Sequence, residues 1–509
     1  MTETTDATTP PDATTTTATT TDATTPTTTR VDLSDIGNAA VFVDCATHDD
    51  TSRDAAERLL YLGSDRGWYY CDVASSLWRR DTTGATMRCA MRMTERLRDI
   101  ADAQSDVVAE NAKRSPKQNA HAWAIRSRAL ARLSAATTIA ASWPTVAAEL
   151  DDFDADPYLL SVHGALVDLR SSTTRERTPA DHIMQRAGSA YEPHATSTQW
   201  LAFLRSCAPA DGADAWINYL QRAVGASLIG EQRDSVLFFC HGRGANGKTT
   251  FLETIRAALG SYAVQMMPDM LMLSRNERHT SELVDLRGAR MAISAEVQSG
   301  GRLDEGKVKR LTGGGSITAA RKGKDSETFA ATFTLWIDGN SDPAISGTDD
   351  GIWRRIKKIP WVRDFSKEPI TDMRAKLRAE LPAVLSWAIE GARLYIAHGL
   401  GEPAIVTEAT AEYRATEDVL GAILAELVTD SPADDLECKR LYELIADEYE
   451  TAGHRRPTAI RINRSLREKG YEQTRTKAGD RSVRAWRGRR LTASASMRPA
   501  SDGWSPTIQ

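Results

Sequence analysis

The sequence predicts an α/β protein: a P-loop core with a parallel sheet, an α/β domain before it and a C-terminal winged helix. An apolar run at residues 235–240 leads into a glycine-rich turn that ends in Gly-Lys-Thr, and a helix-forming segment follows. Apolar runs at 290–295 and 331–337 each close on polar residues, as strands of a parallel α/β sheet do. Beyond residue 408, helical segments precede a two-stranded pattern, which is typical of a winged helix.

The N-terminal segment has the composition of a disordered tail. The first 30 residues contain 17 threonines, four acidic residues and no aromatic, Leu, Ile or Val. Such a segment buries too little apolar surface to offset its ordering entropy, so we expect disorder over residues 1–35. The alternative, a transit peptide, would carry arginines and few acids, whereas Arg30 is the single basic residue here.

The rest of the composition is that of an ordinary soluble protein. No apolar run approaches the roughly 20 residues that span a bilayer, and no signal-peptide pattern is present. The six cysteines are scattered without a C-x-x-C pair, which argues against a structural zinc. We therefore expect a cytoplasmic protein with no membrane partner.

Residues 36–195 carry the mixed pattern of an α/β domain. Helical periodicity marks three segments, at residues 54–62, 87–110 and 120–150. Two strand pairs are expected as well, at residues 67–80 and 157–169. An acidic cluster precedes the second pair, consisting of Asp151, Asp152, Asp154 and Asp156. We interpret it as a solvated loop because no partner at a metal-ligand spacing follows, and metal binding is the alternative.

The glycine-rich turn has the residues that hold phosphates. Glycines let the backbone approach an anion closely, and the following helix presents the positive end of its dipole to it. Lys248 can reach the β- and γ-phosphates, and the Thr249 hydroxyl can bind Mg²⁺. We therefore expect ATP and Mg²⁺ as cofactors, with the nucleotide-binding residues Gly242, Gly244, Ala245, Asn246, Gly247, Lys248, Thr249 and Thr250.

Two polar residues close the later apolar strands. Glu296 is expected to polarise a water against the γ-phosphate, or to hold Mg²⁺ together with Thr249. Asn340 is expected to orient that water. The alternative for each is an ordinary polar residue at a strand end. Their shared position relative to the turn favours a catalytic set of Lys248, Glu296 and Asn340.

Five motifs follow one another along the core. They are Gly242-x-Gly244-x-Asn246-Gly247-Lys248-Thr249, Ala295-Glu296, the Lys-Arg-Leu-Thr-Gly-Gly of residues 309–314, Asn340 with Pro343, and the Gly-Ile-Trp-Arg-Arg-Ile of residues 351–356. This set closely resembles the superfamily 3 helicases, in the phage and plasmid primase-helicase branch that poxvirus-type nucleoside triphosphatases share. Residues 159–169 resemble the stretch that closes the helicase-associated N-terminal domain of that branch.

The resemblance implies an AAA+-like core that assembles into a ring of six, with ATP between subunits. It makes Arg355 the arginine finger that reaches the neighbour's γ-phosphate, with Arg354 as the fallback. A finger in trans makes hydrolysis depend on assembly, and a surface salt bridge is the alternative for this pair. Gly315 stands where the family commonly has Asp, so any role of that acid is missing or taken by another group.

Two basic regions are expected to contact DNA. By the resemblance, a hairpin tip at residues 320–325 would point into the ring channel and hold phosphates of single-stranded DNA. Residues 455–490 contain 13 Lys/Arg and three acids, which is the electrostatic footprint of a duplex contact. A protein-docking winged helix is the alternative for this second region. The expected DNA-binding residues are Arg321, Lys322, Lys324, Arg461, Arg464, Arg467, Lys469, Arg481 and Arg484.

The expected domain limits follow from these patterns. They are a disordered tail at 1–35, a helicase-associated α/β domain at 36–195, a helical linker or collar at 196–231, a superfamily 3 ATPase core at 232–365, a helical lid at 366–407, a winged-helix DNA-binding module at 408–490 and a flexible tail at 491–509.

Together these features predict an ATP-dependent DNA helicase of phage or mobile-element replication, which acts in the host cytoplasm on single-stranded and forked DNA. One alternative is an AAA+ ATPase that loads or remodels replication proteins without unwinding. Another is a replication initiator whose nucleotide site only switches assembly. The roughly 160 residues expected to be ordered before the core resemble the helicase-associated domain and contain neither a convincing paired-carboxylate strand nor a zinc ribbon, so primer synthesis by this chain is not expected. A separate primase or other replication proteins are the candidate partners.

Overall fold

The computed structural model describes residues 31–47, 58–273, 280–294, 301–320, 326–345, 350–367, 372–452, 456–479 and 481–498. The chain divides into two compact units, Met1–Tyr61 with Asp81–Ala147, and Leu62–Arg80 with Ala148–Gln509. Within the described ranges, no helix is both long and apolar enough to cross a bilayer.

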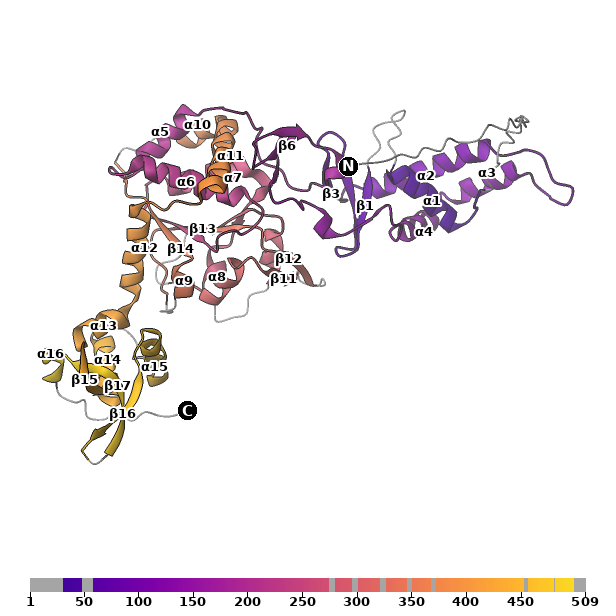
Figure 1. The fold of residues 1–509 in the computed structure, drawn as a ribbon. Helices are drawn as coiled ribbons and strands as arrows, with labels where there is room; N and C mark the ends of the chain where they lie inside the picture. Colours follow the sequence, from indigo (N-terminus) through magenta and orange to yellow (C-terminus); the bar gives the residue numbers. More distant parts are fainter. Residues whose placement is uncertain are drawn as a thin grey trace, which may run out of the picture. The chain divides into compact units, whose positions relative to one another are not determined.

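The described part of the first unit is built mainly from α-helices (Figure 1). They are α1 Asp35–Thr47, α2 Ala85–Asp102, α3 Pro116–Arg126 and α4 Leu130–Ala140. Asn38 of α1 accepts a hydrogen bond from Trp123 Nε1 at 2.8 Å and donates one to Ser127 Oγ at 3.1 Å. The segment predicted as one helix over 120–150 contains parts of two helices, α3 and α4. The helix predicted over 54–62 is wrong where the structure describes it, because strand β1 occupies Leu59–Leu62.

Short antiparallel sheets open the second unit, as the two predicted strand pairs require. One pair consists of β2 Gly67–Asp72 and β3 Leu77–Arg80. The other pair belongs to a sheet of β5 Leu159–Ser161, β6 Ala165–Asp168 and β7 Thr174–Glu176. Strand β4, which is not part of that sheet, consists of the two residues Ala147–Ala148. Short 3-10 helices occur at Leu150–Asp152, Pro179–Asp181, Gly260–Tyr262, Pro268–Leu271 and Thr280–Leu286.

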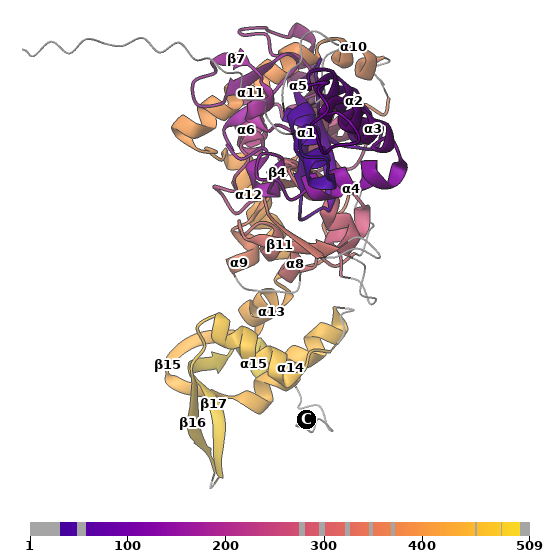
Figure 2. The same ribbon diagram turned by 90° about the vertical axis from the view of Figure 1, so that its right-hand side faces the viewer.

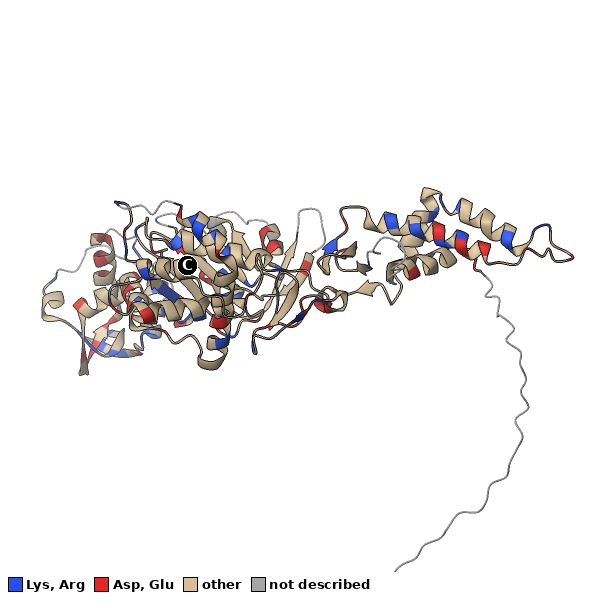
Figure 3. Ribbon diagram, turned by 90° about the horizontal axis from the view of Figure 1, so that it is seen from above, with Lys and Arg blue, Asp and Glu red and all other residues tan. Residues whose placement is uncertain are grey.

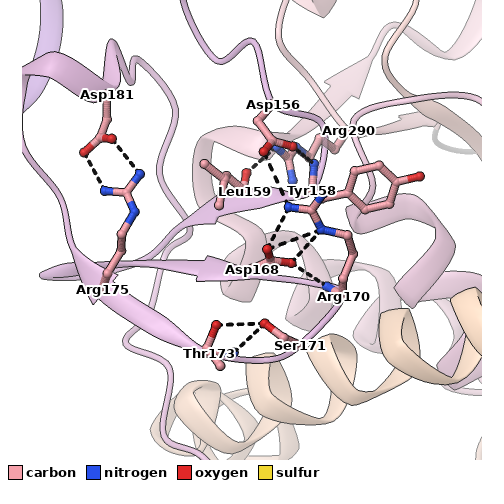
Figure 4. A network of polar contacts seen from close by, with 10 residues as sticks. All are labelled: Asp156, Tyr158, Leu159, Asp168, Arg170, Ser171, Thr173, Arg175, Asp181 and Arg290. Atoms are coloured by element: carbon pink, nitrogen blue, oxygen red, sulfur yellow. Dashed lines mark hydrogen bonds and ion pairs between the residues drawn. The ribbon is translucent and has the colours of Figure 1, made fainter. Parts of the chain in front are cut away.

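The acidic cluster before β5 is part of this sheet's surroundings. Asp156 lies 3.7 Å from the Nη2 atom of Arg170, in the network of Figure 4. Asp154 accepts the backbone N–H groups of Met184 at 3.2 Å and Gln185 at 3.4 Å. In the described part of the chain, no group of three or more His, Cys, Asp or Glu side chains suits a metal ion. The Asp154 and Asp156 carboxylates thus contact groups of the protein, and Asp151 with Asp152 lie in the 3-10 helix Leu150–Asp152, so a solvated loop does not describe the whole cluster.

The core of the second unit is a five-stranded parallel sheet (Figure 1). Its order is β14-β8-β13-β10-β9, and all four neighbouring pairs run parallel. The strands are β8 Leu237–His241, β9 Ala263–Met266, β10 Met291–Ser294, β13 Thr334–Gly339 and β14 Ile356–Pro360. The predicted α/β class with a parallel sheet is confirmed. The sequence patterns missed β9 and β14.

Both faces of this sheet are covered (Figure 1). Phe238 and Phe239 are consecutive on β8, are 0% and 1% exposed, and pack into two different hydrophobic clusters. One face carries α5 Thr198–Cys207, α6 Ala213–Leu228, α7 Lys248–Leu259, α10 Met373–Ala379 and α11 Leu381–His398. The other carries α8 Glu305–Leu311, α9 Asp350–Trp353 and the hairpin of β11 Ser316–Ala320 and β12 Ser326–Ala330.

Two glycines allow α6 and α11 to approach closely. A Cβ atom added at Gly225 would lie 2.0 Å from the backbone carbonyl carbon of Gly391. No side chain fits between backbones at this distance, so α11 is held directly against α6. The residues expected to form a lid therefore include a helix that is part of the core.

Helix α12 (Ala404–Glu417) crosses the boundary predicted between residues 407 and 408. Four of its side chains, at helical spacing, bond to the loops and strands of the core. They are Thr410, Tyr413, Arg414 and Glu417, whose respective partners are Lys358, Pro343, Asp350 and Ile345. The whole of α12 thus belongs to the core, and the following segment begins at residue 418.

The C-terminal segment forms its own small α/β module (Figure 2). Its antiparallel sheet has the order β15-β17-β16. Leu427, Leu441, Leu466 and Trp486 belong to its hydrophobic core. The elements are α13 Val419–Leu427, β15 Val428–Glu437, α14 Cys438–Thr451, α15 Ala459–Glu468, β16 Gln473–Ala478, β17 Arg481–Leu491 and α16 Ala493–Ser496.

Candidate nucleotide site

The glycine-rich turn joins β8 to α7 at the carboxyl edge of the sheet. Gly244, Ala245 and Gly247 have φ angles of 104°, 46° and 93°, in the left-handed region that favours glycine. A Cβ atom at Gly247 would lie 2.5 Å from Cys207 Sγ, and one at Gly242 would lie 2.4 Å from the Trp361 carbonyl oxygen. The turn therefore has little room for side chains. It ends at the first turn of α7, where unpaired N–H groups can bind an anion.

Lys248 is the centre of a buried hydrogen-bond network. Its side chain is 3% exposed, and Nζ donates to Gly242 O at 2.9 Å, Asn246 Oδ1 at 3.0 Å and Asn340 Oδ1 at 3.0 Å. Asn340 directly follows β13, which neighbours β8, so the strand order brings these two predicted residues together. Asn246 also donates to Trp361 O at 3.1 Å, which ties the turn to the residue after β14.

An acid that sequence reasoning missed lies beside the predicted metal ligand. Thr249 Oγ1 donates a hydrogen bond to Asp338 Oδ2 at 2.8 Å. Asp338 Oδ1 is 3.9 Å from Lys248 Nζ. The signal was its position two residues before Asn340 at a strand end. The sequence does not show that this strand lies next to β8, so the local pattern does not indicate that Asp338 lies beside Thr249.

A cavity of about 520 Å³ adjoins this pair. Thr249 and Asp338 line it together with apolar side chains and with the polar side chains of Glu253, Arg256, Gln265, Glu282 and Asp285. Hard oxygen atoms around an open space suit a divalent cation that keeps several of its waters. The Thr249 and Asp338 oxygens therefore fit the predicted cofactor Mg²⁺.

Several predicted residues fall outside the described part of the chain. Glu296 is one, and Ser294, at the end of β10, is the last residue described before it. The others are Arg321, Lys322 and Lys324 of the expected channel hairpin. The described strands on either side, β11 and β12, pair antiparallel.

The two adjacent arginines differ in exposure. Arg355 is 9% exposed, and its guanidinium donates to Thr312 Oγ1 at 3.1 Å and to Gly351 O at 2.5 Å. Arg354 is exposed. A guanidinium that contacts a neighbouring subunit has to project from the surface. The burial of Arg355 therefore argues against its predicted role as the finger.

A second polar network borders the site at the end of β8. His241 Nε2 lies 3.6 Å from Asp342 Oδ1, and Lys358 Nζ lies 2.7 Å from Asp342 Oδ2. Burial lowers the pKa of His241, and the positive charge of Lys358 lowers it further. The imidazole is therefore held in its neutral form more strongly than in an unfolded chain.

The predicted DNA-binding residues of the C-terminal module have different surroundings. Lys469 forms an ion pair with Asp418, so its charge is already partnered. Arg467 donates to the Gln473 side chain at 2.8 Å. The basic positions are blue in Figure 3. The predicted DNA-binding residues that are exposed on α15 and β17 are Arg461, Arg464, Arg467, Arg481 and Arg484, and Arg487 and Arg490 of β17 are exposed as well.

The fold defines an α/β protein whose five-stranded parallel sheet and glycine-rich turn are consistent with a P-loop core. Residues 51–209 match the family described as D5 N terminal like. Residues 240–355 match a family described as of unknown function. The chain is thus similar to these two families and, more distantly, to viral putative helicases and primases, which confirms the resemblance that its motifs predict.

The matched relatives are viral proteins. The putative helicase L207/L206 of Acanthamoeba polyphaga mimivirus is 26% identical over 330 residues, which are 59% of this chain and 34% of the relative. The putative helicase 022R of Frog virus 3 is 27% identical over 277 residues, 49% of this chain and 28% of the relative. The putative primase C962R of an African swine fever virus isolate is 25% identical over 218 residues, 41% and 22% of the two chains. The match thus spans about a third or less of each relative.

Among solved structures, the C-terminal region of NrS-1 is similar at 10% sequence identity. The match covers 85% of this chain and 96% of that one, with a TM-score of 0.46.

One prediction lacks support in these comparisons. Relatives named putative primases match 218 residues of this chain. The expectation that this chain makes no primer is therefore withdrawn.

Proposed function

We propose that this protein is an ATP- and Mg²⁺-dependent DNA helicase that moves along single-stranded DNA as a ring. The observation that carries the proposal is the buried contact between Lys248 and Asn340, which puts a phosphate-binding lysine and a water-orienting amide at one sheet edge. The relatives from mimivirus and Frog virus 3 that are named putative helicases support unwinding as its use.

Each group at the sheet edge has a task in this proposal. Lys248 holds the β- and γ-phosphates, in exchange for the neutral acceptors that it contacts now. Thr249 holds Mg²⁺, which when bound neutralises charge on the phosphates. Asn340 orients the attacking water. Glu296 follows β10, the neighbour of β13, and polarises that water.

We assign the arginine finger to Arg354 in place of Arg355. Arg354 is exposed directly after α9, whereas the Arg355 guanidinium donates to Thr312 and Gly351 of its own chain. Moving Arg355 to a neighbour would leave those acceptors without it. In a ring of six, Arg354 would then reach the γ-phosphate bound to the adjacent subunit and stabilise the charge that develops there.

The C-terminal module is proposed to be a winged helix that binds duplex DNA. Helix α15 would enter the groove, and β16 with β17 would form the wing. Exposed arginines on both elements would contact phosphates, which makes binding depend on salt. Lys469 is left out because it pairs with Asp418. The channel contacts to single-stranded DNA would come from Arg321, Lys322 and Lys324.

Strand displacement on forked DNA tests the proposal. We expect ATP hydrolysis that single-stranded DNA stimulates, and both hydrolysis and displacement should be lost in Lys248→Ala. Lys376→Ala is the matched control, because Lys376 is exposed on α10. It should behave as the natural chain.

Other outcomes identify the alternatives. Hydrolysis that DNA does not stimulate, with no displacement at any ionic strength, would favour an ATPase that loads or remodels other proteins. Nucleotide binding without hydrolysis would favour a switch that controls assembly on DNA. Primer synthesis is measured in the same preparation with a single-stranded template and nucleoside triphosphates.

A further inference from the structure

We propose that Asp338 is the positioning residue for Mg²⁺: its carboxylate fixes the Thr249 hydroxyl and places a negative charge beside the cation. The inference rests on the proposed nucleotide site. The expected metal ligands, Thr249 and Glu296, come from the P-loop helix and from the segment after β10. Asp338 adds an acid from β13, the strand that lies between β8 and β10.

The hydrogen bond between Thr249 and Asp338 sets the direction of the hydroxyl. A threonine hydroxyl has one hydrogen and two lone pairs. Oγ1 gives its hydrogen to Asp338 Oδ2 at 2.8 Å, so its lone pairs are available to a cation. A carboxylate that holds a ligand in this way typically changes metal affinity when it is removed.

Strand register explains why the carboxylate lies there. Asp338 is paired with Cys240, two residues before Gly242 at the start of the phosphate-binding turn. Its side chain is 14% exposed and lines the cavity of about 520 Å³ together with Thr249. The cavity leaves room for a cation and for the waters that Mg²⁺ keeps.

The charges near Asp338 are consistent with this role. Its Oδ1 atom is 3.9 Å from Lys248 Nζ, and that ammonium stabilises negative charge on the carboxylate. Asp338 thus lies between the residue that binds phosphate and the residue that binds metal. The competing role is purely electrostatic, in which Asp338 only balances the charge of buried Lys248. The two roles differ in whether metal is needed for the effect.

The test measures metal dependence in the full chain. Binding of a fluorescent ATP analogue is titrated with Mg²⁺, and Mn²⁺ binding is followed by electron paramagnetic resonance. Asp338→Asn keeps the side-chain shape and removes the charge. We expect it to need about 10- to 100-fold more Mg²⁺ for half-saturation, as loss of an outer-shell partner usually causes. Nucleotide affinity in excess chelator should stay unchanged.

Three further variants make the test specific. Glu426→Gln removes an exposed carboxylate on α13, outside the cavity, and should keep the natural Mg²⁺ dependence. The loss of Mg²⁺ affinity in Thr249→Ala combined with Asp338→Asn should be smaller than the sum of the two single losses, because part of the effect of the acid acts through the hydroxyl. Asp338→Glu, which retains the charge, should recover at least part of the metal affinity.

The outcomes separate this inference from the proposed function. A folded Asp338→Asn protein with the natural Mg²⁺ requirement overturns the inference, and so does an equal loss of nucleotide affinity with and without metal. If Asp338→Asn does not fold, the Mg²⁺ requirements of Asp338→Glu and Thr249→Ala are compared instead. Additive effects of these two changes on the Mg²⁺ requirement overturn the inference. If the natural chain binds no nucleotide at all, the proposed function fails.

Discussion

At the scale of single residues, the phosphate-binding lysine separates activity from stability. Lys248→Ala removes the ammonium that would hold phosphate, so we expect hydrolysis to fall by at least about 100-fold, as for other transition-state contacts. Its three hydrogen-bond acceptors lose a donor and the Asp338 carboxylate loses the ammonium 3.9 Å away, but the cost of burying that ammonium also disappears, so these effects oppose each other. The midpoint of thermal unfolding should fall by less than about 5 °C. Parallel ATPase and unfolding measurements check this, and global unfolding of the variant would contradict it.

His241 gives the site a pH dependence. Its pKa is lowered in the folded protein, chiefly by burial and then by Lys358, while Asp342 and Glu412 oppose the shift. Near pH 6.5, the His241 imidazole therefore binds a proton in the unfolded chain more readily than in the folded chain. The stability from this group is complete above pH 6.5 and is lost as the pH falls toward the folded pKa. His241→Gln should lose less stability between pH 7.5 and pH 5.5 than the natural chain, as measured by thermal unfolding. Equal losses would contradict the prediction.

At the residue level, the sequence points to residues that the structure brings together where a motif fixes the neighbours, as for Lys248 and Asn340. The glycine-rich turn identifies Lys248, and Asn340 was found because it ends an apolar strand. Asp338 has the same kind of position, but its importance depends on strand order. Nothing in the local sequence says that β13 lies beside β8. The burial of Arg355 could likewise not be predicted from the sequence, because nothing in the local pattern distinguishes it from the adjacent Arg354.

At the scale of elements, the contact between α6 and α11 is sensitive to one carbon atom. Gly225→Ala would place a Cβ atom 2.0 Å from the Gly391 backbone, so the helices would have to separate. We expect a loss of about 2 kcal/mol in the free energy of unfolding, a typical cost of overpacking. Chemical denaturation measures it. Gly63→Ala is the control, because a Cβ atom there meets nothing within 4 Å. Equal stability of the two variants would contradict the packing argument.

Helix α12 holds the loop that follows Asn340. The Tyr413 hydroxyl donates to Pro343 O, three residues after the amide that contacts Lys248. Tyr413→Phe removes this bond and keeps the ring. We expect a roughly three- to tenfold lower kcat with unchanged KM for ATP, because a loosened loop costs about 1 kcal/mol in positioning. Tyr449→Phe, in the C-terminal module, is the control. A change confined to KM would contradict the prediction.

Element prediction from sequence depended on how apolar each strand is. Three core strands are continuous apolar runs and were recognised. Strand β14 has the sequence Ile-Lys-Lys-Ile-Pro, and its two lysines conceal it. Lys358 is nevertheless buried, because Asp342 neutralises its charge and its ammonium lies 5.0 Å from the centre of the Tyr413 ring. Such compensation arises from residues distant in sequence, so a local pattern does not reveal it.

At the scale of the whole molecule, the end of α12 separates the core from the C-terminal module. A chain that ends after Glu417 keeps α12 and should retain ATP hydrolysis. It loses the five exposed arginines of α15 and β17 that are predicted to contact DNA, so the salt slope of duplex binding should fall by about 4 units. A chain that ends after residue 407 loses the α12 contacts and should unfold at lower temperature. Similar stability of the two truncated chains would contradict the boundary at residue 418.

The position of Lys248 has a consequence for the energetics of nucleotide capture. Its ammonium has already been stripped of water by folding, and polar groups of the protein stand where the first hydration shell would be. An incoming triphosphate therefore does not have to dehydrate this cation. The ammonium only exchanges its neutral oxygen acceptors in the protein for charged phosphate oxygens. Capture should proceed with a small heat-capacity change, because little surface becomes ordered or dried at that moment. The free energy needed to dehydrate the Lys248 ammonium is thus supplied during folding and lowers the net stability of the fold.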